Sequence, residues 1–456
     1  MLRKTVNVVH KNLFLSIYAL RQAKKEKIPK TKVTETSAEV DFQDALNKIV
    51  QSISQLVKID KNTKAKLICK IGFDGSGGHS VYKQRFENTG TERTDEYMFL
   101  SAFVPLRLMD LDSGELLWKN DRPGSTLYCR PIKFVFLKES PNLVKQEENE
   151  ISGKIDNVME CNVPVGDYIL QTSFEFHFTM VDGSVCNILS DTYSTATCYI
   201  CGALPSEMNT EKVSQKAPNK QYYRFGLSTL HLWIRLFECL LHIAYRLSFK
   251  RWRAMGKENK DLLAQEKKRI QSEFKLKMGL IVDQPKQGFG SSNDGNTARR
   301  FFSDPKLSSE ITKIEQALIE KLSLVIRVIA SGLEIRVEMF RSLLCETKDL
   351  YLKHYSWFYM PCTLHKLLFH GVEIMQYFDV PIGQMTEEAL EASHKVFRRT
   401  RLHHARKTSR IFNCQDVMNH MLLMSDPFIS SKRKCIKKTE SYRPRYCKVP
   451  GLLRRT

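Results

Sequence analysis

The sequence lacks an uninterrupted apolar run of the length that a membrane-spanning helix needs. Its most apolar stretch, residues 230–247, contains two arginines, a glutamate and two histidines, whereas a bilayer requires about 20 predominantly apolar residues. The N-terminal apolar stretch is interrupted by Lys11, and no small-residue cleavage site of the secretory kind follows it. We therefore expect a soluble intracellular protein without a membrane partner.

Acidic residues are scarce relative to basic ones. The 50 Asp and Glu are outnumbered by 71 Lys and Arg, which gives a net charge of +21 over 456 residues. A charge of this sign indicates a polyanionic partner, nucleic acid before a membrane surface, and hence a nuclear location. The 12 cysteines, without a secretory signal, indicate a reducing compartment in which thiols are free or bound to metal. No internal repeat is present.

Between about residues 61 and 200 the sequence is typical of strands joined by turns. Strands are predicted over 66–73, 97–108, 131–137 and 168–181. Asp74 and Asp182 each follow one of these strands and precede a glycine, which is where an open α/β sheet offers side chains to a ligand. Asp-Gly is also ordinary turn chemistry, and each aspartate taken singly is better explained as a turn residue.

The rest of the chain is mainly helical by periodicity. Helices are predicted, in chain order, over 42–57, 227–249, 257–278, 309–332 and 333–355. The first of these is a core helix, a dimer face or both. The loop 285–302 holds Gly288 and Gly290 and then Arg299 and Arg300 at a helix start. That order would suit a grip on a phosphate backbone, and an ordinary surface connection is the alternative.

The segment from Met385 to Arg410 has no Pro or Gly, begins with three carboxylates and ends in a basic run. This charge order suits the dipole of a single helix, with Thr386 as its N-cap. Such a helix could place a carboxylate at a metal and a basic face on a nucleic-acid backbone. An ordinary surface helix with salt-bridged faces is the alternative.

Two cysteines and two histidines have spacings found in zinc sites. Cys198 and Cys201 form a C-x2-C pair, and His365 and His370 lie five residues apart near a predicted helix. Two thiolates and two imidazoles would make a closed, structural zinc site, although neither spacing establishes one alone. A zinc ion here would join a long helical insertion to the sheet.

Taken together, these segments resemble the Transib transposases and the related catalytic core of the V(D)J recombination-activating endonuclease. The resemblance runs from about residue 33 to 425. It is carried by VTETSAEVDFQDALNKIVQSI (33–53), IGFDGSGG (71–78), FEFHFTMVDGSVCNIL (174–189), YICGALPSE (199–207), NDGNTARRFF (293–302), DLYLKHYSW (349–357), LHKLLFHGVEIM (364–375) and EALEASHKVFRRTRLHHARKTSR (388–410).

The resemblance implies an α/β catalytic core with an RNase H-like mixed sheet and a large, mainly α-helical, zinc-binding insertion. By position, Asp74, Asp182 and Glu391 would hold two Mg²⁺ or Mn²⁺ ions, and Glu139 matches a further family acid. Two such ions suit phosphodiester chemistry, because they activate a nucleophile and stabilise the leaving oxygen. In the family, water first nicks one strand; the freed 3′-hydroxyl then attacks the opposite strand, giving a hairpin, or attacks target DNA.

The resemblance also implies zinc ligands and DNA contacts. Cys198, Cys201, His365 and His370 fall at the family's zinc positions, and Trp357 aligns, within one residue, with an aromatic that stacks on a flipped base. The basic residues expected at phosphates of double-stranded DNA are Arg299, Arg300, Lys395, Arg398, Arg399, Arg401 and Arg406. A homodimer is expected because the family processes two DNA ends together, and the need for an accessory subunit stays open.

Five segments are predicted: a basic N-terminal segment with a dimerisation or DNA-binding helix (1–60), the RNase H-like catalytic sheet (61–200), the helical zinc-stapled insertion (201–380), the catalytic helix that closes the sheet domain (381–425) and a basic, disordered tail (426–456). The expected function is that of a DDE-type transposase or recombinase-like polynucleotidyl transferase, or of a host protein derived from one. The alternatives are a catalytically inactive DNA-binding protein and a zinc-stabilised protein-interaction module.

Overall fold

The computed structural model describes residues 16–79, 86, 94–210, 215–285, 291–433 and 452–453. They form two compact units, which we describe separately. The sheet unit comprises residues up to 139, 148–176 and 389–435, and the helical unit comprises 140–147, 177–388 and the residues after 435. Most of the expected basic tail, and the glycines at 288 and 290, lie outside the described residues.

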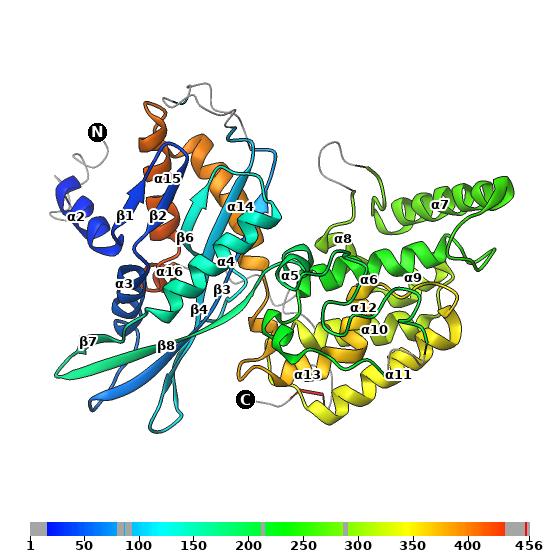
Figure 1. The fold of residues 1–456 in the computed structure, drawn as a ribbon, viewed down its shortest axis with the longest axis horizontal. Helices are drawn as coiled ribbons and strands as arrows, with labels where there is room; N and C mark the ends of the chain where they lie inside the picture. The colour runs from blue at the N-terminus through cyan, green and yellow to red at the C-terminus, as the bar shows by residue number, and fades with distance from the viewer. Residues whose placement is uncertain are drawn as a thin grey trace, which may run out of the picture. The chain divides into compact units, whose positions relative to one another are not determined.

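Eight strands of the described chain form one mixed, curled sheet, in the order β1-β2-β6-β4-β3-β8-β7, with β5 paired to β4 (Figure 1). The strands are β1 (Thr31–Val33), β2 (Ser37–Val40), β3 (Thr63–Ser76), β4 (Met98–Asp110), β5 (Leu116–Lys119), β6 (Arg130–Val135), β7 (Cys161–Val165) and β8 (Tyr168–Met180). The helices that accompany them are α2 (Ile17–Lys27), α3 (Phe42–Ser54), α4 (Pro141–Asp156), α14 (Glu388–His403), α15 (Arg410–Met424) and α16 (Pro427–Lys432).

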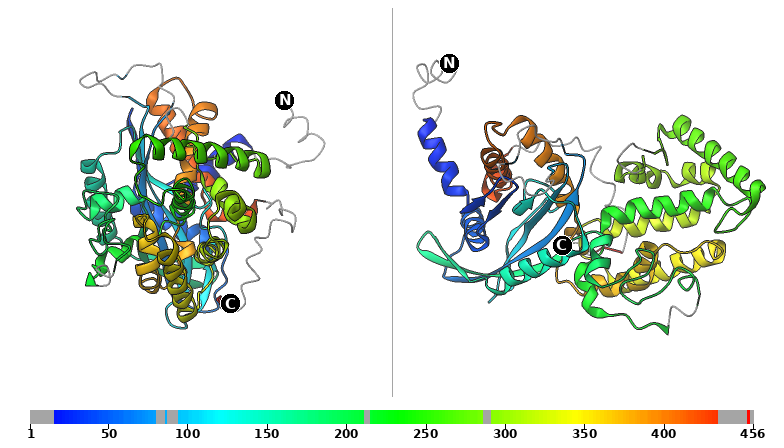
Figure 2. Two further views of the ribbon diagram at one scale, coloured as in Figure 1. Left: turned by 90° about the vertical axis from the view of Figure 1, so that its right-hand side faces the viewer. Right: turned by 45° about the horizontal axis from the view of Figure 1, so that its top comes forward.

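Helices cover both faces of this sheet (Figure 2), and strand β6 shows how the sequence directs them. Successive side chains of a strand point to opposite faces. Lys133 therefore faces α4, where its ammonium group binds Glu150 at 2.6 Å. Phe134 faces α14, where its ring meets Phe397 edge-on at 4.9 Å between centroids. The central strands β3 and β4 are buried on both faces along most of their length, as expected of a sheet that is covered on both sides.

The helical unit contains α5 (Gly183–Leu189), η2 (Lys220–Phe225), α6 (Thr229–Ala244), α7 (Gly256–Met278), α8 (Gly295–Ser303), α9 (Pro305–Thr312), α10 (Gln316–Ile329), α11 (Val337–Tyr355), α12 (Cys362–His365), η3 (Lys366–His370), α13 (Gly371–Gln376) and η4 (Ile382–Gln384). Its core lies between α6, α8 and α10. Trp233 of α6 meets Phe302 of α8 with ring centroids 5.7 Å apart. A side chain at Gly295 would place its Cβ 2.7 Å from Leu230, so close helix packing accounts for that glycine.

The long helices and strands lie where the sequence predicts them, but two predicted helices are interrupted. The four predicted strands correspond to β3, β4, β6 and β8, and an α/β core with a large helical portion is present. The predicted helix over 309–332 is two helices, separated where Lys313 takes a left-handed φ of 62°. The single helix expected over 385–410 is also wrong, because α14 ends at His403 and α15 begins at Arg410. Thr386 nevertheless accepts a hydrogen bond from the backbone N–H of Glu388 at 3.0 Å.

No helix within the described ranges is both long enough and apolar enough to cross a membrane.

Candidate functional site

Two carboxylates and an imidazole come together in the sheet unit. Asp74 lies on β3, and Glu391 and His394 lie on α14; one ligand atom from each is within 4.8 Å of the others. The carboxylate Oδ2 of Asp74 and Nε2 of His394 are 2.9 Å apart, a hydrogen-bond distance. Glu391 and His394 share a helix face because residues three apart are neighbours on a helix surface. We call these three residues the carboxylate cluster.

The same face of α14 is attached to the loop that follows β3. The guanidinium of Arg398 donates to the carbonyl oxygen of Gly77 at 3.0 Å. The ring of Phe397 lies edge-on to His79, with centroids 5.6 Å apart, and His79 Nε2 is 2.7 Å from the hydroxyl of Ser76. Burial, followed by the charge of Arg398, lowers the pKa of His79 to about 4. The loop is thus fixed to the helix by contacts that flank the carboxylate cluster.

Glu139 also lies at this end of β3. Its Oε2 accepts a hydrogen bond from the backbone N–H of Gly75 at 3.0 Å. A Cβ on Gly75 would approach the same oxygen to 2.6 Å, so only glycine permits the contact. The further acid expected from the sequence is therefore held one residue along the strand from Asp74.

Asp182 belongs to the helical unit, where it follows the end of β8 and caps α5. Its Oδ1 accepts the backbone N–H of Val185 at 2.8 Å, and the side chain lines a cavity together with Ser228 and His231. His231 Nδ1 is 3.2 Å from Oε1 of Glu387, which also accepts a hydrogen bond from the Ser228 hydroxyl. Asp182 therefore lies beside polar groups that the sequence patterns did not single out.

Glu387 is the least exposed carboxylate of this group. It is 5% exposed, and its second oxygen, Oε2, is buried without a hydrogen-bond partner. Burial lowers the pKa of His231, but the hydrogen bond and charge of Glu387, with a contribution from Asp182, outweigh burial and raise that pKa. The group therefore favours a positive charge on His231.

A second cluster, in the helical unit, joins two thiols and two imidazoles. One ligand atom from each of Cys198, Cys201, His365 and His370 lies within 4.8 Å of the others. The Sγ of Cys201 is 3.3 Å from Nε2 of His365, close to the separation of about 3.5 Å that two such ligands have around one tetrahedral zinc ion. We call these four residues the thiol–imidazole cluster.

The two histidines converge because the chain between them forms a π turn. Residues Lys366–His370 adopt the π-helical form between α12 and α13. In an α-helix, residues five apart point about 140° away from each other. The wider π turn, with its i→i+5 hydrogen bonds, brings them to the same side. His365 and His370 therefore face each other, with ring centroids 5.1 Å apart.

The donor atoms of the thiol–imidazole cluster fit a bound metal ion. Nε2 of His370 is buried without a hydrogen-bond partner, which is uncommon for a buried polar atom. The hydrogen bond with Cys201 lowers the pKa of the Cys198 thiol. The hydrogen bond with Cys362 and burial have a larger effect in the opposite direction, so the pKa is raised to about 11. Without a cation the cluster would therefore hold neutral thiols around an unpaired nitrogen, and soft sulfur and nitrogen ligands favour zinc.

The basic residues of α14 divide between its two faces. Lys395 and Arg399 are exposed, as a phosphate contact requires. Arg398 is committed to the carbonyl of Gly77. Arg401 is only 6% exposed and forms an ion pair with Asp95. A phosphate contact by Arg401 would require it to leave this ion pair, in which Asp95 is shared with Arg410.

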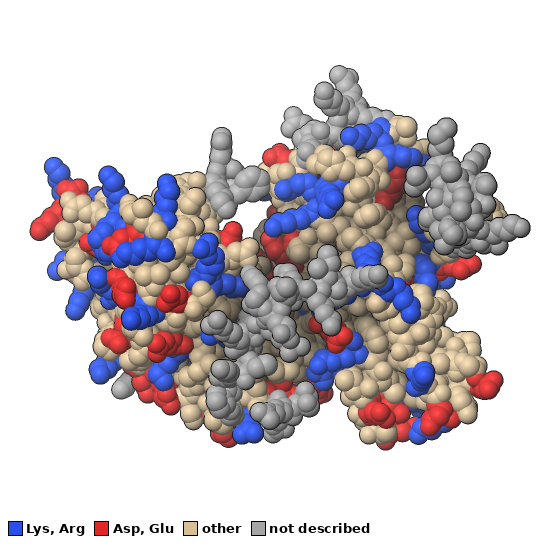
Figure 3. All heavy atoms as spheres, turned by 180° about the vertical axis from the view of Figure 1, so that it is seen from behind, with Lys and Arg blue, Asp and Glu red and all other residues tan. Residues whose placement is uncertain are grey.

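The other basic candidates have partners of their own. Both nitrogens on one edge of the exposed Arg406 guanidinium bind Asp416, at 2.8 and 2.9 Å. Arg299 pairs with Glu388 at 2.5 Å, and Arg300 donates to the carbonyl oxygen of Met278, at the end of α7. Lysine and arginine side chains are nevertheless spread over the face of the molecule drawn in Figure 3, with acidic side chains between them.

Trp357, expected to stack on a base, is half-buried just after α11. Its ring lies edge-on to Phe358 with centroids 5.8 Å apart. The buried indole nitrogen has no hydrogen-bond partner.

His394 is the main residue that the sequence patterns did not identify. The signal was present, because Glu391 and His394 form a Glu-x-x-His pair, and this i, i+3 spacing supplies metal ligands from a single helix in other proteins. The Ser228–His231–Glu387 group had no such signal, since its members are 159 residues apart at the extremes.

Comparisons with known proteins give little further guidance. No family model matches the chain, and no curated protein does. Among solved structures, the chain is similar to the Drosophila P element transposase strand transfer complex, at 8% sequence identity and a TM-score of 0.35. The match covers 94% of this chain and 90% of that chain.

Proposed function

We propose that this protein is a DDE-type DNA transposase or recombinase-like strand transferase of the Transib kind, built on an RNase H-like core. The observation that carries the proposal is the carboxylate cluster. Two members of this cluster are acids that the sequence resemblance selects: Asp74 lies on a central strand of the sheet, and Glu391 lies on α14. The third acid that the resemblance selects is Asp182, which follows β8 in the chain.

The carboxylate cluster suits a hard divalent cation. Carboxylate oxygens are the ligands that Mg²⁺ prefers, and the Asp74 side chain is 19% exposed, which leaves an open side toward solvent. When bound, two such ions would activate the attacking hydroxyl and stabilise the leaving oxygen of a phosphodiester. The chain's own contribution is to orient the acids: His394 holds Asp74 by a hydrogen bond of 2.9 Å, and Gly75 holds Glu139.

The thiol–imidazole cluster is assigned a structural zinc ion in this proposal. Its four ligands come from the loop after α5 and from the α12–η3 segment, so a shared ion would fasten those two parts of the helical unit together. Double-stranded DNA is the proposed substrate, because the net charge of +21 matches a polyanion. A nuclear homodimer, working with or without an accessory subunit, completes the proposal.

A pre-nicked DNA duplex with a free 3′-hydroxyl tests the activity directly. The purified protein is incubated with this duplex and Mn²⁺ or Mg²⁺, and hairpin and joined products are separated on a denaturing gel. Glu391→Gln should lower product formation more than about 100-fold, since even an outer-shell partner of a metal ligand contributes 10–100-fold. Glu388→Gln is the matched control, because Glu388 lies one turn earlier on α14 but pairs with Arg299.

The result also separates the two leading functions. Product that disappears with Glu391→Gln supports the strand transferase. Salt-sensitive DNA binding without product from the parental protein would instead favour a non-catalytic DNA-binding protein, for which the exposed basic residues of α14 already provide a surface.

A further inference from the structure

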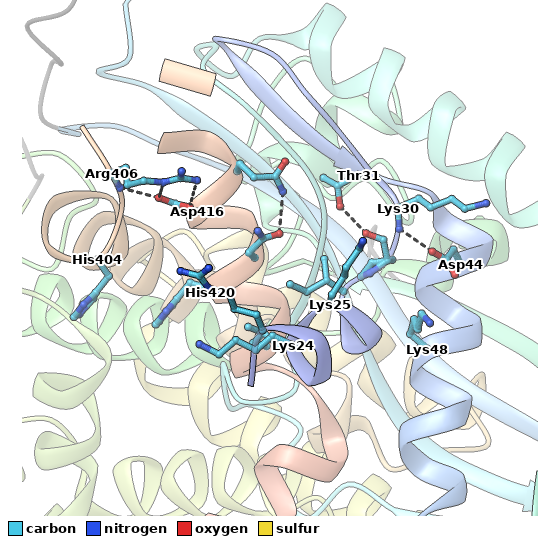
Figure 4. Close-up of a pocket in the computed structure, with 16 residues that line it drawn as sticks. Lys24, Lys25, Lys30, Thr31, Asp44, Lys48, His404, Arg406, Asp416 and His420 are labelled. Atoms are coloured by element: carbon cyan, nitrogen blue, oxygen red, sulfur yellow. Dashed lines mark hydrogen bonds and ion pairs between the residues drawn. The ribbon is translucent and has the colours of Figure 1, made fainter. Parts of the chain in front are cut away.

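A basic hollow of about 910 Å³ lies in the sheet unit and shares no residue with the carboxylate cluster (Figure 4). It opens between α2, the start of β1, α3 and the α15 region. Its basic side chains are Arg21, Lys24, Lys25, Lys30, Lys48, His404, Arg406 and His420. We call this the basic hollow.

The basic side chains of the hollow outnumber the acidic side chains that line it. Of the two acids in its lining, Asp416 already holds Arg406 through both oxygens, and Asp44 accepts the backbone N–H of Lys30 at 2.7 Å. The structure gives Arg21, Lys24, Lys25 and Lys48 no ion pair with any described residue. Several cations therefore face one concavity without fixed counterions.

The arrangement of α2 concentrates that charge in one direction. Arg21, Lys24 and Lys25 lie at positions i, i+3 and i+4 and so share one face of the helix. Figure 4 shows Lys24 beside His420 and Lys48 on α3. All of α2 is free of buried residues, so these lysines do not serve to pack the helix.

Two stacked histidines line the same hollow. The rings of His404 and His420 are nearly parallel, at 5°, with centroids 5.5 Å apart. Burial, and then the positive charges of His404, Arg433 and Lys24, lower the pKa of His420. A bound anion would reverse this electrostatic effect and favour protonation of the histidines.

We propose that the basic hollow binds consecutive phosphates of a DNA strand. The choice of DNA rests on the proposed function. The hollow adds a phosphate-binding surface that lies outside the carboxylate cluster. Contacts to phosphates fix the position of a duplex without reading its sequence. The basic hollow would therefore hold DNA of any sequence while the carboxylate cluster acts on it.

The test is the salt dependence of duplex binding by the full chain in buffer without added Mg²⁺, Mn²⁺ or chelator, measured by fluorescence anisotropy. The hollow variant is Lys24→Glu/Lys25→Glu. The matched control is Lys58→Glu/Lys61→Glu, which makes the same charge change at exposed positions of the same unit that do not line the hollow. The hollow variant should bind at least about 10-fold more weakly than the control, and the slope of log affinity against log salt should fall by about 2. Equal losses in the two variants would overturn the proposal.

Two further arms identify the ligand and the role of the histidines. Inorganic tripolyphosphate is used as a competitor: if Lys24→Glu/Lys25→Glu loses tripolyphosphate binding but keeps duplex affinity, the hollow binds a free polyphosphate and the DNA assignment is wrong. Parental binding should tighten as the pH is lowered from neutral, because histidines are the side chains that gain a proton there, and His404→Gln/His420→Gln should remove that gain. A gain that persists in the double variant would exclude the histidines from the contact.

This test is independent of strand cleavage, because the Mg²⁺ or Mn²⁺ that cleavage needs is left out of the buffer. A hollow variant that binds like the control, together with Glu391-dependent product from the nicked duplex, would reject the hollow alone. Hollow-dependent duplex binding without any product would retain the hollow and reject the strand transferase.

Discussion

The thiol–imidazole cluster and the carboxylate cluster differ first in their access to solvent. Three of the four thiol–imidazole ligands are buried and only Cys201 is partly exposed, whereas both carboxylates of the other cluster reach solvent, Glu391 fully and Asp74 partly, and only His394 is buried. Structural zinc sites are closed by four protein ligands, and catalytic sites keep a position open for water or substrate. The burial of each cluster therefore separates a site that holds the chain together from a site that can meet a substrate.

The two clusters also differ in the chemistry of their donor atoms. Sulfur and imidazole nitrogen select zinc among the common cellular cations, and carboxylate oxygen selects Mg²⁺ or Mn²⁺. Under the proposed assignment, the two clusters would hold different metals. Removal of the first should change folding, and removal of the second should change chemistry alone.

The largest expected effect is the loss of the proposed zinc ion. Cys198→Ser or His370→Ala should each remove zinc from the protein and lower the melting temperature sharply, since a structural zinc ion contributes on the order of 10 kcal/mol to folding. Cys345→Ser is the control, because Cys345 is exposed on α11 and outside the cluster. Zinc content is measured by mass spectrometry of the metal. An unchanged zinc content and melting curve in both variants would refute the site.

The next effect concerns the buried ion pair of α14. Arg401→Ala should reduce the free energy of unfolding by about 3–5 kcal/mol, because it leaves Asp95, which is 0% exposed, with one guanidinium partner fewer. Arg399→Ala, on the exposed face of the same helix, should change it by less than about 0.5 kcal/mol. Urea unfolding of the two variants makes the comparison. Equal stability would show that the pair with Asp95 is not formed.

Periodicity in the sequence predicted the long elements well. Strands β3 and β4 are long apolar runs, and α6 has a continuous apolar face, so burial dictated both their pattern and their structure. The short strands β1, β2, β5 and β7 were not predicted, because three to five residues carry too little periodic signal. Helix α4 was missed as well, since it is rich in charged residues, some of which meet a sheet face through ion pairs.

The candidate sites were predictable in residue type but not in geometry. His365 and His370 would point apart on an α-helix. The sequence KLLFH has no feature that predicts the π turn that brings them together. Arg401 and Arg399 have the same chemistry, and only the packing of α14 on the sheet decides which one is buried. The partner that decides this, Asp95, is 306 residues away in the chain.

A smaller effect is expected where His394 orients Asp74. His394→Gln should raise the Mn²⁺ concentration needed for half-maximal product formation by about 10–100-fold, the usual contribution of a residue that orients a metal ligand. The Lys395→Gln variant, with its change on the exposed face, should need the parental Mn²⁺ concentration. A His394→Gln protein with lower maximal rate but an unchanged Mn²⁺ requirement would contradict a role in holding the metal site.

The smallest effect separates the two faces of α14 in DNA binding. Arg399→Ala should weaken duplex binding a few-fold and reduce the salt slope by about 1, because one exposed guanidinium contributes about one phosphate contact. Arg398→Ala should leave the slope nearly unchanged, because this side chain is used to hold the carbonyl of Gly77. If both substitutions reduced the slope equally, Arg398 would have to leave Gly77 when DNA binds. The loop beside the carboxylate cluster would then be rearranged by the substrate itself.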